Sequence, residues 1–141
     1  MMLRREIADI VAAYCAECPE IVACYLFGSQ ANGKARPQSD VDLAFLLRGE
    51  FSSGEYFDVR MKFVAELSEL LHRDVDTVLL NDANEVLAGQ VFSHGIPVYG
   101  EDDPALRAFR RGKLPLIAEF SYYIDLRLAS LRARYGGPTH G

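Results

Sequence analysis

Two carboxylates, Asp40 and Asp42, stand two residues apart where an apolar segment, Val41 to Leu47, begins. Side chains of a β-strand alternate between its faces, so both carboxylates would point to one side and Val41 to the other. Two carboxylates this close repel each other unless a positive charge lies between them. A divalent cation that carries a nucleotide would supply this charge, because hard cations prefer carboxylate and phosphate oxygens. The spacing therefore indicates a site for metal-assisted phosphate chemistry.

A Gly-Ser pair precedes these carboxylates. Gly28 and Ser29 follow an apolar run from Ile21 to Phe27, and ten residues separate Ser29 from Asp40. A glycine after a strand permits close approach of the backbone, and a serine at a helix start can offer its hydroxyl and backbone amides to phosphate. The pair could therefore form the second half of the same site.

The loop between the two halves carries positive charge. Lys34 and Arg36 lie within it and could contact a triphosphate, although a solvated loop is an equally open interpretation of each. Ser39 directly precedes Asp40 and could brace the turn into the strand.

Gly-Ser, ten residues and Asp-x-Asp together resemble the signature of the nucleotidyltransferase superfamily related to DNA polymerase beta. The small size of the chain is similar to the minimal nucleotidyltransferase (MNT) group of that superfamily. The resemblance implies that Asp40 and Asp42 are catalytic metal ligands and that Gly28, Ser29 and the loop residues Lys34, Arg36 and Ser39 bind the nucleotide. It also implies ATP as co-substrate and a pair of Mg²⁺ ions.

The resemblance further implies a third catalytic carboxylate and metal ligand on the neighbouring strand. Asp74 and Asp76 are the two candidates there. Asp76 fits the family pattern better, because it follows an apolar residue and precedes further strand residues. Asp74 would then be solvated at the entrance to the strand.

The best understood proteins of the MNT group resemble antitoxins that are paired with HEPN-domain toxins. This implies a protein adenylyltransferase that transfers AMP from ATP to a tyrosine of a cognate HEPN ribonuclease toxin and so silences it. Two alternatives stay open: an aminoglycoside-type nucleotidyltransferase that modifies a small molecule, and a non-catalytic antitoxin that acts by binding alone. The first usually needs carboxylates from an additional helical domain, and the second would not need three carboxylates.

Composition limits the class of protein. The chain has 141 residues, enough for one domain over residues 1–141, in which residues 103–135 would be a C-terminal helical extension. The net charge of −5 argues against a general nucleic-acid-binding protein. No apolar run approaches the roughly 20 residues that span a bilayer, and the N-terminus lacks the apolar core of a signal peptide. We expect a cytoplasmic protein that has neither a membrane nor a nucleic acid as partner.

Periodicity predicts an α+β fold: a three- to four-stranded mixed sheet flanked by helices, with a C-terminal helix. The link over 28–39 is too short for a crossover helix, so its two flanking strands should pair antiparallel. The predicted helices before the tail cover residues 2–17, about 53–72 with a capping box from Ser52 to Glu55, and a short helix through Phe92, capped by Asp82 with Glu85 and ended by Gly95. The predicted strands cover residues 21–27, 41–47, 74–80 and 96–99. A one-turn helix should open at Ser29.

Apolar residues spaced three and four apart predict the buried faces of two helices. For the helix over about 53–72 the predicted buried stripe is Phe57, Met61, Val64, Leu67 and Leu71. In the tail, Gly112 and Pro115 should separate a short helix that ends near Arg111 from a longer one over 115–135. The stripe of the longer helix is Leu114, Ile117, Phe120, Ile124, Leu128 and Leu131, and its opposite flank carries Tyr123, Arg127, Arg132 and Arg134. Three interpretations stay open: this stripe packs on the protein's own sheet, helix 115–135 docks on the HEPN toxin, or the first turns pack on the sheet and the last turns dock on the toxin.

Cysteine and histidine add no further site. Cys15 and Cys18 form a C-x-x-C pair without a second pair or a nearby histidine, so they are predicted to be small buried residues, as is Cys24. His72 and His94 have no evident partners and are predicted to be surface or cap residues.

Overall fold

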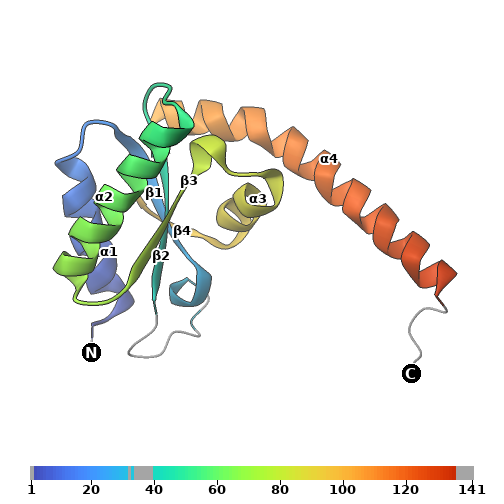
Figure 1. The fold of residues 1–141 in the computed structure, drawn as a ribbon, viewed down its shortest axis with the longest axis horizontal. Coiled ribbons are helices and arrows are strands. Elements are labelled where there is room, and N and C mark those ends of the chain that lie inside the picture. Colours follow the sequence, from blue (N-terminus) through green and yellow to red (C-terminus); the bar gives the residue numbers. More distant parts are fainter. Residues whose placement is uncertain (1, 32, 34–39, 136–141) are drawn as a thin grey trace.

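The computed structural model describes residues 2–31, 33 and 40–135 and contains one mixed β-sheet with helices on both faces (Figure 1). The strands are β1 (Ile21–Phe27), β2 (Val41–Leu47), β3 (Val75–Leu79) and β4 (Ile96–Tyr99), in the spatial order β3-β2-β1-β4. Strand β1 is antiparallel to β2 and to β4, whereas β2 and β3 are parallel. The predicted α+β class and the antiparallel pairing across the Gly-Ser link are confirmed.

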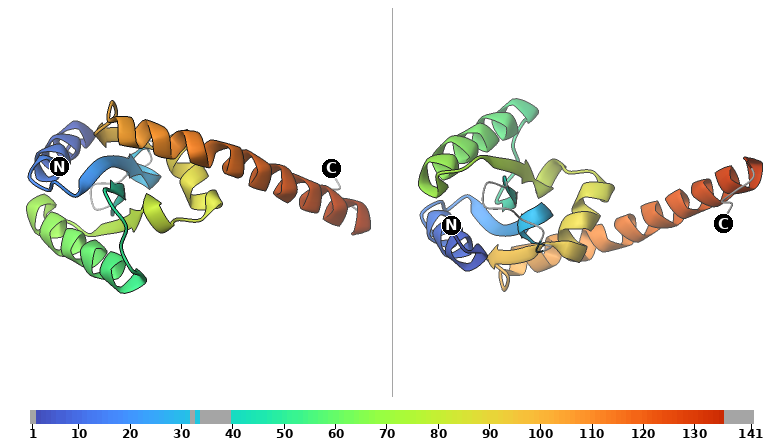
Figure 2. Two further views of the ribbon diagram at one scale, coloured as in Figure 1. Left: turned by 90° about the horizontal axis from the view of Figure 1, so that it is seen from above. Right: turned by 90° about the horizontal axis from the view of Figure 1, so that it is seen from below.

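In the described part of the chain, four α-helices flank the sheet: α1 (Arg4–Ala16), α2 (Ser53–Leu71), α3 (Glu85–His94) and α4 (Pro104–Arg134). Helices α1 and α2 lie on one face of the sheet, and α3 and the first part of α4 lie on the other (Figures 1 and 2). Two short 3₁₀ turns, η1 (Gly28–Gln30) and η2 (Leu80–Asp82), follow β1 and β3. Turn η1 begins one residue before the predicted start at Ser29.

Strand alternation divides the core into two layers. In β2, Leu43, Phe45 and Leu47 pack with α1 and α2, while Ala44 and Leu46 pack in the cluster beneath α3 and α4. Asp42 has the parity of Ala44, so its side chain belongs to the α3/α4 face. This placement decides on which side of the sheet any chemistry of Asp42 takes place.

Helix α2 has the predicted start but a different buried face. The Ser52 side chain accepts from the Glu55 N–H and the Glu55 carboxylate accepts from the Ser52 N–H, which completes the capping box. The buried residues of α2 are Phe63, Leu67 and Leu71, whereas Phe57 and Met61 are exposed. The predicted stripe was wrong in its first half, because a face centred on Phe63 leaves Phe57 and Met61 turned away around the helix.

The predicted cap of α3 was also wrong. Asn84, not Asp82, is the N-cap, and its side chain accepts from the Leu87 N–H at 2.9 Å. Asp82 ends the turn η2, and Ala83 is extended, so Asn84 is the residue that directly precedes the helix. The predicted C-cap at Gly95 is confirmed: its N–H donates to the Val91 carbonyl at 2.7 Å.

Helix α4 is one continuous helix of 31 residues, although two helices were predicted. Asp103 caps its start, and Pro115 lies inside it without ending it. Pro115 has no N–H to donate to the carbonyl of Arg111, but Arg111 is exposed, so water can satisfy that carbonyl. Leu106 is the one buried residue of α4, and the far half of the helix extends beyond the sheet (Figure 2).

Cys15, Cys18 and Cys24 are buried free thiols, as predicted. Among the described residues, no helix is both long and apolar enough to cross a membrane.

Candidate active site

Gly28 lies against a carboxylate of the neighbouring strand. It follows β1 with φ of +71°, and a Cβ atom built on it would collide with Oδ2 of Asp42. The contact arises because Phe27, the last residue of β1, is the register partner of Asp42 on β2. Both the left-handed backbone and the close approach require glycine here. The structure thus joins the two halves of the predicted motif.

Gly28→Ala is expected to lower the free energy of unfolding by about 1–2 kcal/mol or more, because alanine resists this backbone conformation and its Cβ displaces Asp42. The matched control is Gly112→Ala, since Gly112 lies inside α4 with open space around it; this change should be neutral or stabilise by roughly 0.5–1 kcal/mol. Chemical denaturation of both variants measures the difference. A Gly28→Ala protein as stable as the wild type would show that Asp42 leaves room for a Cβ atom on residue 28.

Turn η1 positions Ser29, the second residue of the motif, which is half-buried. A guanidinium group from α1 braces the end of this turn: Nη1 of Arg4 donates to the Ala31 carbonyl at 3.2 Å and reaches the Gln30 carbonyl at 3.4 Å. Gln30 is only 5% exposed, and its Nε2 has no hydrogen-bond partner. Neither Arg4 nor Gln30 was singled out from the sequence, since no local pattern reveals a contact across 26 residues.

Three carboxylates approach one another at the N-terminal ends of β2 and β3. Asp42 and Asp76 are register partners in the parallel pair, and Asp40 precedes β2. Burial, followed by the nearby charges of Asp76 and Asp40, raises the pKa of the Asp42 carboxyl. Asp74 is not among the causes of this shift. It is exposed before β3, and its backbone carbonyl accepts from the Val41 N–H at 2.9 Å.

Asp76 is held by its own strand and by α2. Its Oδ1 accepts from the Thr77 N–H at 3.0 Å and lies 4.0 Å from Nη2 of Arg60. Arg60 is fixed in turn, because its Nε donates to the Thr77 carbonyl at 2.9 Å. The Asp76 side chain is nevertheless 68% exposed, so a change of rotamer would cost only these two interactions and would meet no packed neighbours.

The donor set suits a divalent cation in its chemistry. Carboxylate oxygens are the ligands that Mg²⁺ prefers. Burial, and after it the charges of Asp76 and Asp40, raises the pKa of Asp42, and a cation would compensate both the burial and this negative charge. In the described part of the chain, however, no three His, Cys, Asp or Glu side chains are grouped closely enough to hold a metal ion. Asp40, Asp42 and Asp76 would therefore have to reorient around the ion, and the exposed Asp76 can do so.

Lys34, Arg36 and Ser39, the predicted contacts to phosphate, lie outside the described residues. His72 is exposed and caps α2 with φ of 56°. His94 is exposed as the last residue of α3, but it also lines a cavity of about 460 Å³ beside Gly28, together with Phe27, Leu87 and Gln90. The sequence did not point to Gln90 or His94, because their proximity to Gly28 depends on how α3 packs.

Residues 9–104 match the family described as Polymerase beta, Nucleotidyltransferase. The chain belongs to this family. The resemblance seen in the Gly-Ser and Asp-x-Asp pattern is confirmed.

The chain is also similar to individual proteins and solved structures. Protein adenylyltransferase MntA of Shewanella oneidensis is 33% identical over 87 residues, which cover 60% of this chain and 60% of that protein. A chain of the toxin–antitoxin with AMP-PNP has a TM-score of 0.68 at 24% identity, covering 89% of this chain and 96% of that chain. A chain of the tri-AMPylated Shewanella oneidensis HEPN toxin in complex with MNT antitoxin has a TM-score of 0.65 at 22% identity, covering 93% and 98%. These two likenesses establish the fold.

Proposed function

We propose that this protein is a Mg²⁺-dependent adenylyltransferase that transfers AMP from ATP to a tyrosine of a HEPN-domain toxin and thereby acts as its antitoxin. The observation that carries the proposal is the contact of Gly28 with Asp42, which is itself the register partner of Asp76. The similarity to protein adenylyltransferase MntA supports protein, and not a small molecule, as the acceptor.

In the reaction, the phenolic oxygen of the acceptor tyrosine attacks the α-phosphorus of ATP. A new oxygen–phosphorus bond forms, the bond from that phosphorus to the oxygen bridging to the β-phosphate breaks, and pyrophosphate leaves with the electron pair. Bound Mg²⁺ would neutralise the charge that develops on the entering and leaving oxygens. Asp40 and Asp42 would hold the metal, and Asp76 would lie nearest the nucleophile and receive its proton. Gly28 and Ser29 would place backbone amides and a hydroxyl against the triphosphate.

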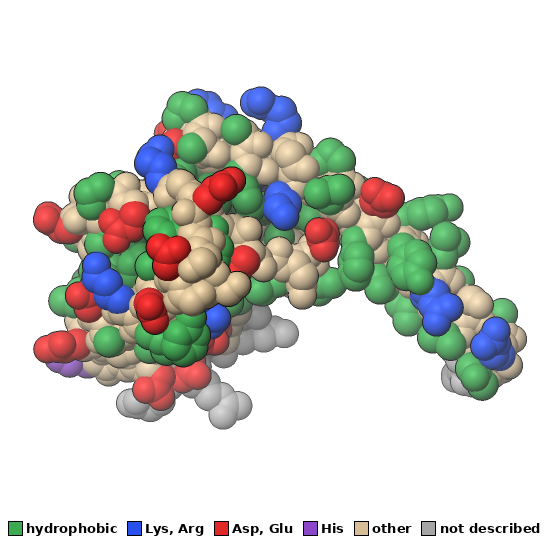
Figure 3. Space-filling view, turned by 45° about the horizontal axis from the view of Figure 1, so that its top comes forward, with side chains coloured by type: hydrophobic (Ala, Val, Ile, Leu, Met, Phe, Trp, Pro, Cys, Tyr) green, Lys and Arg blue, Asp and Glu red, His purple; other side chains and the backbone are tan. Residues whose placement is uncertain are grey.

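The far half of α4 is the surface that we assign to the toxin. The early members of its apolar stripe, Ile117 and Phe120, are half-buried and line the contact with α3. Beyond Phe120 every described residue is exposed, and Figure 3 shows hydrophobic side chains interspersed with arginine along this end. The exposed apolar residues here are Tyr122, Tyr123, Ile124, Leu126, Leu128, Leu131 and Tyr135. Exposed apolar surface of this extent, with arginine and tyrosine, is typical of a protein interface.

The experiment that tests the function also separates the two candidate carboxylates. Purified protein is incubated with its HEPN partner, Mg²⁺ and ATP labelled at the α-phosphate, and label on the partner is measured. Asp76→Asn is expected to lower the transfer rate about 10²- to 10³-fold, because a charge that stabilises the transition state is lost. Asp74→Asn, the matched control two residues away, should stay within about threefold of the wild type, since surface changes away from such features have small effects.

Failure of the wild type to label the partner would refute the proposed function. Loss of transfer in Asp74→Asn with normal transfer in Asp76→Asn would identify Asp74, and not Asp76, as the third metal ligand.

A further inference from the structure

One side chain of the N-terminal helix reaches the turn that carries the Gly-Ser pair. Arg4 is the first residue of α1, and its Nη1 donates to the Ala31 carbonyl at 3.2 Å and to the Gln30 carbonyl at 3.4 Å. Both carbonyls lie at the end of η1, the turn that begins with Gly28 and Ser29. One guanidinium group thus ties together two segments that lie 26 residues apart along the chain.

The two sides of this contact are held by different means. Helix α1 is fixed to the sheet by Ile7, Val11 and Cys15, each of which is 0% exposed. The turn η1 is closed by the Ala31 N–H, which donates to the Gly28 carbonyl at 3.1 Å. Gln30 is buried in this turn, but its Nε2 has no hydrogen-bond partner, so that donor does not hold the turn in place. Arg4 therefore transmits the fixed position of α1 to a turn that leaves one of its own buried donors unused.

The guanidinium group binds the carbonyl end of the turn, and the proposed contacts to phosphate lie at its other end. In a helical turn the carbonyl groups point toward the C-terminal end and the N–H groups toward the N-terminal end. A cation at the carbonyl end is therefore on the favourable side of these dipoles, and it leaves the N–H groups at the start of the turn for an anion. Because Gly28 already lies against Asp42, a shift of the turn would also change its spacing from the carboxylates.

We infer that Arg4 is a positioning residue for the nucleotide: it holds the Gly-Ser turn in the place that the triphosphate of ATP requires. This inference rests on the proposed function, because that function puts the triphosphate against Gly28 and Ser29. Arg4 acts through the turn, since its donor atom is engaged by two backbone carbonyls. Without the guanidinium group the turn is held less firmly and ATP binds less tightly, whereas the groups that perform the chemistry are unchanged.

The test compares Arg4→Gln with Arg5→Gln, an equal loss of charge at the next residue of α1. Arg5 is exposed as Arg4 is, but it donates to neither carbonyl of the turn. Calorimetric titration with α,β-methylene-ATP and Mg²⁺ measures nucleotide affinity in the absence of any transfer. Arg4→Gln should raise the Kd of this analogue and the KM for ATP about tenfold and keep kcat within about threefold of the wild type, because hydrogen bonds from a charged donor are lost. Arg5→Gln should leave all three values within about twofold.

A conservative variant separates positioning from folding. Arg4→Lys keeps a cation that can donate to the same carbonyls, so its Kd for the analogue should stay within about threefold of the wild type. The unfolding temperature of Arg4→Gln should stay within about 3 °C of the wild type, because the side chain is exposed. A large fall in this temperature would overturn the inference, since general loss of structure would then explain the weaker binding. Arg4→Lys that binds the analogue no better than Arg4→Gln would overturn it as well.

Unchanged affinity for the analogue in Arg4→Gln would overturn the inference, as would an equal loss in Arg5→Gln, because net charge and not the contact with the turn would then govern binding. A lower kcat at unchanged Kd would also overturn it. The proposed function fails separately. If the analogue binds with the help of Arg4 but the HEPN partner receives no AMP, the positioning role stands and the chemistry is wrong. If AMP is transferred and Arg4→Gln keeps the wild-type Kd and KM, the chemistry stands and the role of Arg4 is wrong.

Discussion

Asp42→Asn is expected to lower AMP transfer by a factor on the order of 10³, because in the proposed mechanism Asp42 would hold the metal and asparagine supplies no negative charge. Asp42 occupies the centre of the site: it contacts Gly28, opposes Asp76 in register and shares its charged surroundings with Asp40. Asparagine keeps the shape of the side chain and removes only its charge. The transfer rate with labelled ATP and the HEPN partner measures the loss.

The same variant should be at least as stable as the wild type without metal. Burial and the neighbouring carboxylates raise the pKa of Asp42 in the folded protein, so its ionised form opposes folding at pH values above that pKa. As pH falls through the raised pKa, the wild type gains a proton and the penalty disappears. Thermal unfolding should therefore show the advantage of Asp42→Asn near pH 7 and its loss toward about pH 4, near the ordinary range of aspartate.

A matched substitution distinguishes the loss of Asp42 from the loss of a negative charge elsewhere on the protein. Asp58→Asn removes the same charge from an exposed position of α2, and we expect unchanged transfer and unchanged stability. Addition of Mg²⁺ should raise the unfolding temperature of the wild type and of Asp58→Asn, but hardly that of Asp42→Asn. Full AMP transfer by Asp42→Asn would show that the metal is held elsewhere.

The face of Asp42 and the pairing of the first two strands were predictable, because they depend on a short stretch of sequence. The alternation in Val41–Leu47 places Asp42 opposite to Val41, and the short link after Gly28 forces antiparallel pairing of β1 and β2. Parallel pairing of β2 with β3 then sets Asp76 beside Asp42. The first two steps follow from strand geometry and the length of a connection, whereas a third carboxylate beside Asp42 was expected only from the family resemblance.

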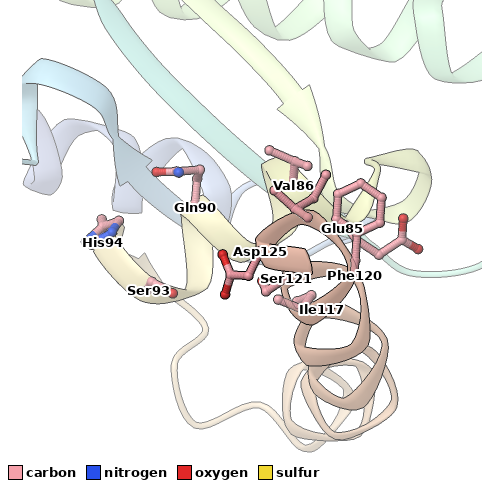
Figure 4. A pocket seen from close by; sticks show the side chains of 11 residues that line it. Glu85, Val86, Gln90, Ser93, His94, Ile117, Phe120, Ser121 and Asp125 are labelled. Atoms are coloured by element: carbon pink, nitrogen blue, oxygen red, sulfur yellow. The ribbon is translucent and has the colours of Figure 1, made fainter. Parts of the chain in front are cut away.

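Helix faces and contacts between distant segments were less predictable. The buried face of α2 centres on Phe63, because it is selected by Phe45 of β2, whose ring lies 4.6 Å from that of Phe63 between centroids. Pro115 predicted a break in α4, yet the helix continues, since a solvent-exposed turn tolerates the lost hydrogen bond. The hollow that Gln90 and His94 line between α3 and α4 (Figure 4) depends on how closely these helices pack, and a Cβ on Gly89 would lie only 3.1 Å from Cγ2 of Ile117. Such features require the tertiary arrangement.

The exposed far half of α4 leads to the second large expected effect. Replacing Leu126, Leu128 and Leu131 together by glutamine should weaken binding of the HEPN partner about 100-fold or more, because buried apolar residues at an interface contribute about 1 kcal/mol or more each. All three are exposed in the free protein and belong to a helix that glutamine also favours. The fold should therefore survive, with an unchanged far-UV circular dichroism spectrum and an unchanged unfolding temperature.

Phe57 and Met61 provide the matched control for this change. They are also exposed large apolar residues, but they lie on α2, on the opposite face of the sheet from α3. Phe57→Gln with Met61→Gln should leave partner affinity unchanged if binding is confined to α4. Calorimetric titration of the partner into wild type and both variants compares the three affinities. If the α4 variant keeps wild-type affinity, the far half of the helix is not the docking surface. If the α2 variant loses as much affinity as the α4 variant, binding depends on general hydrophobicity, because the two sites lie on opposite faces of the sheet.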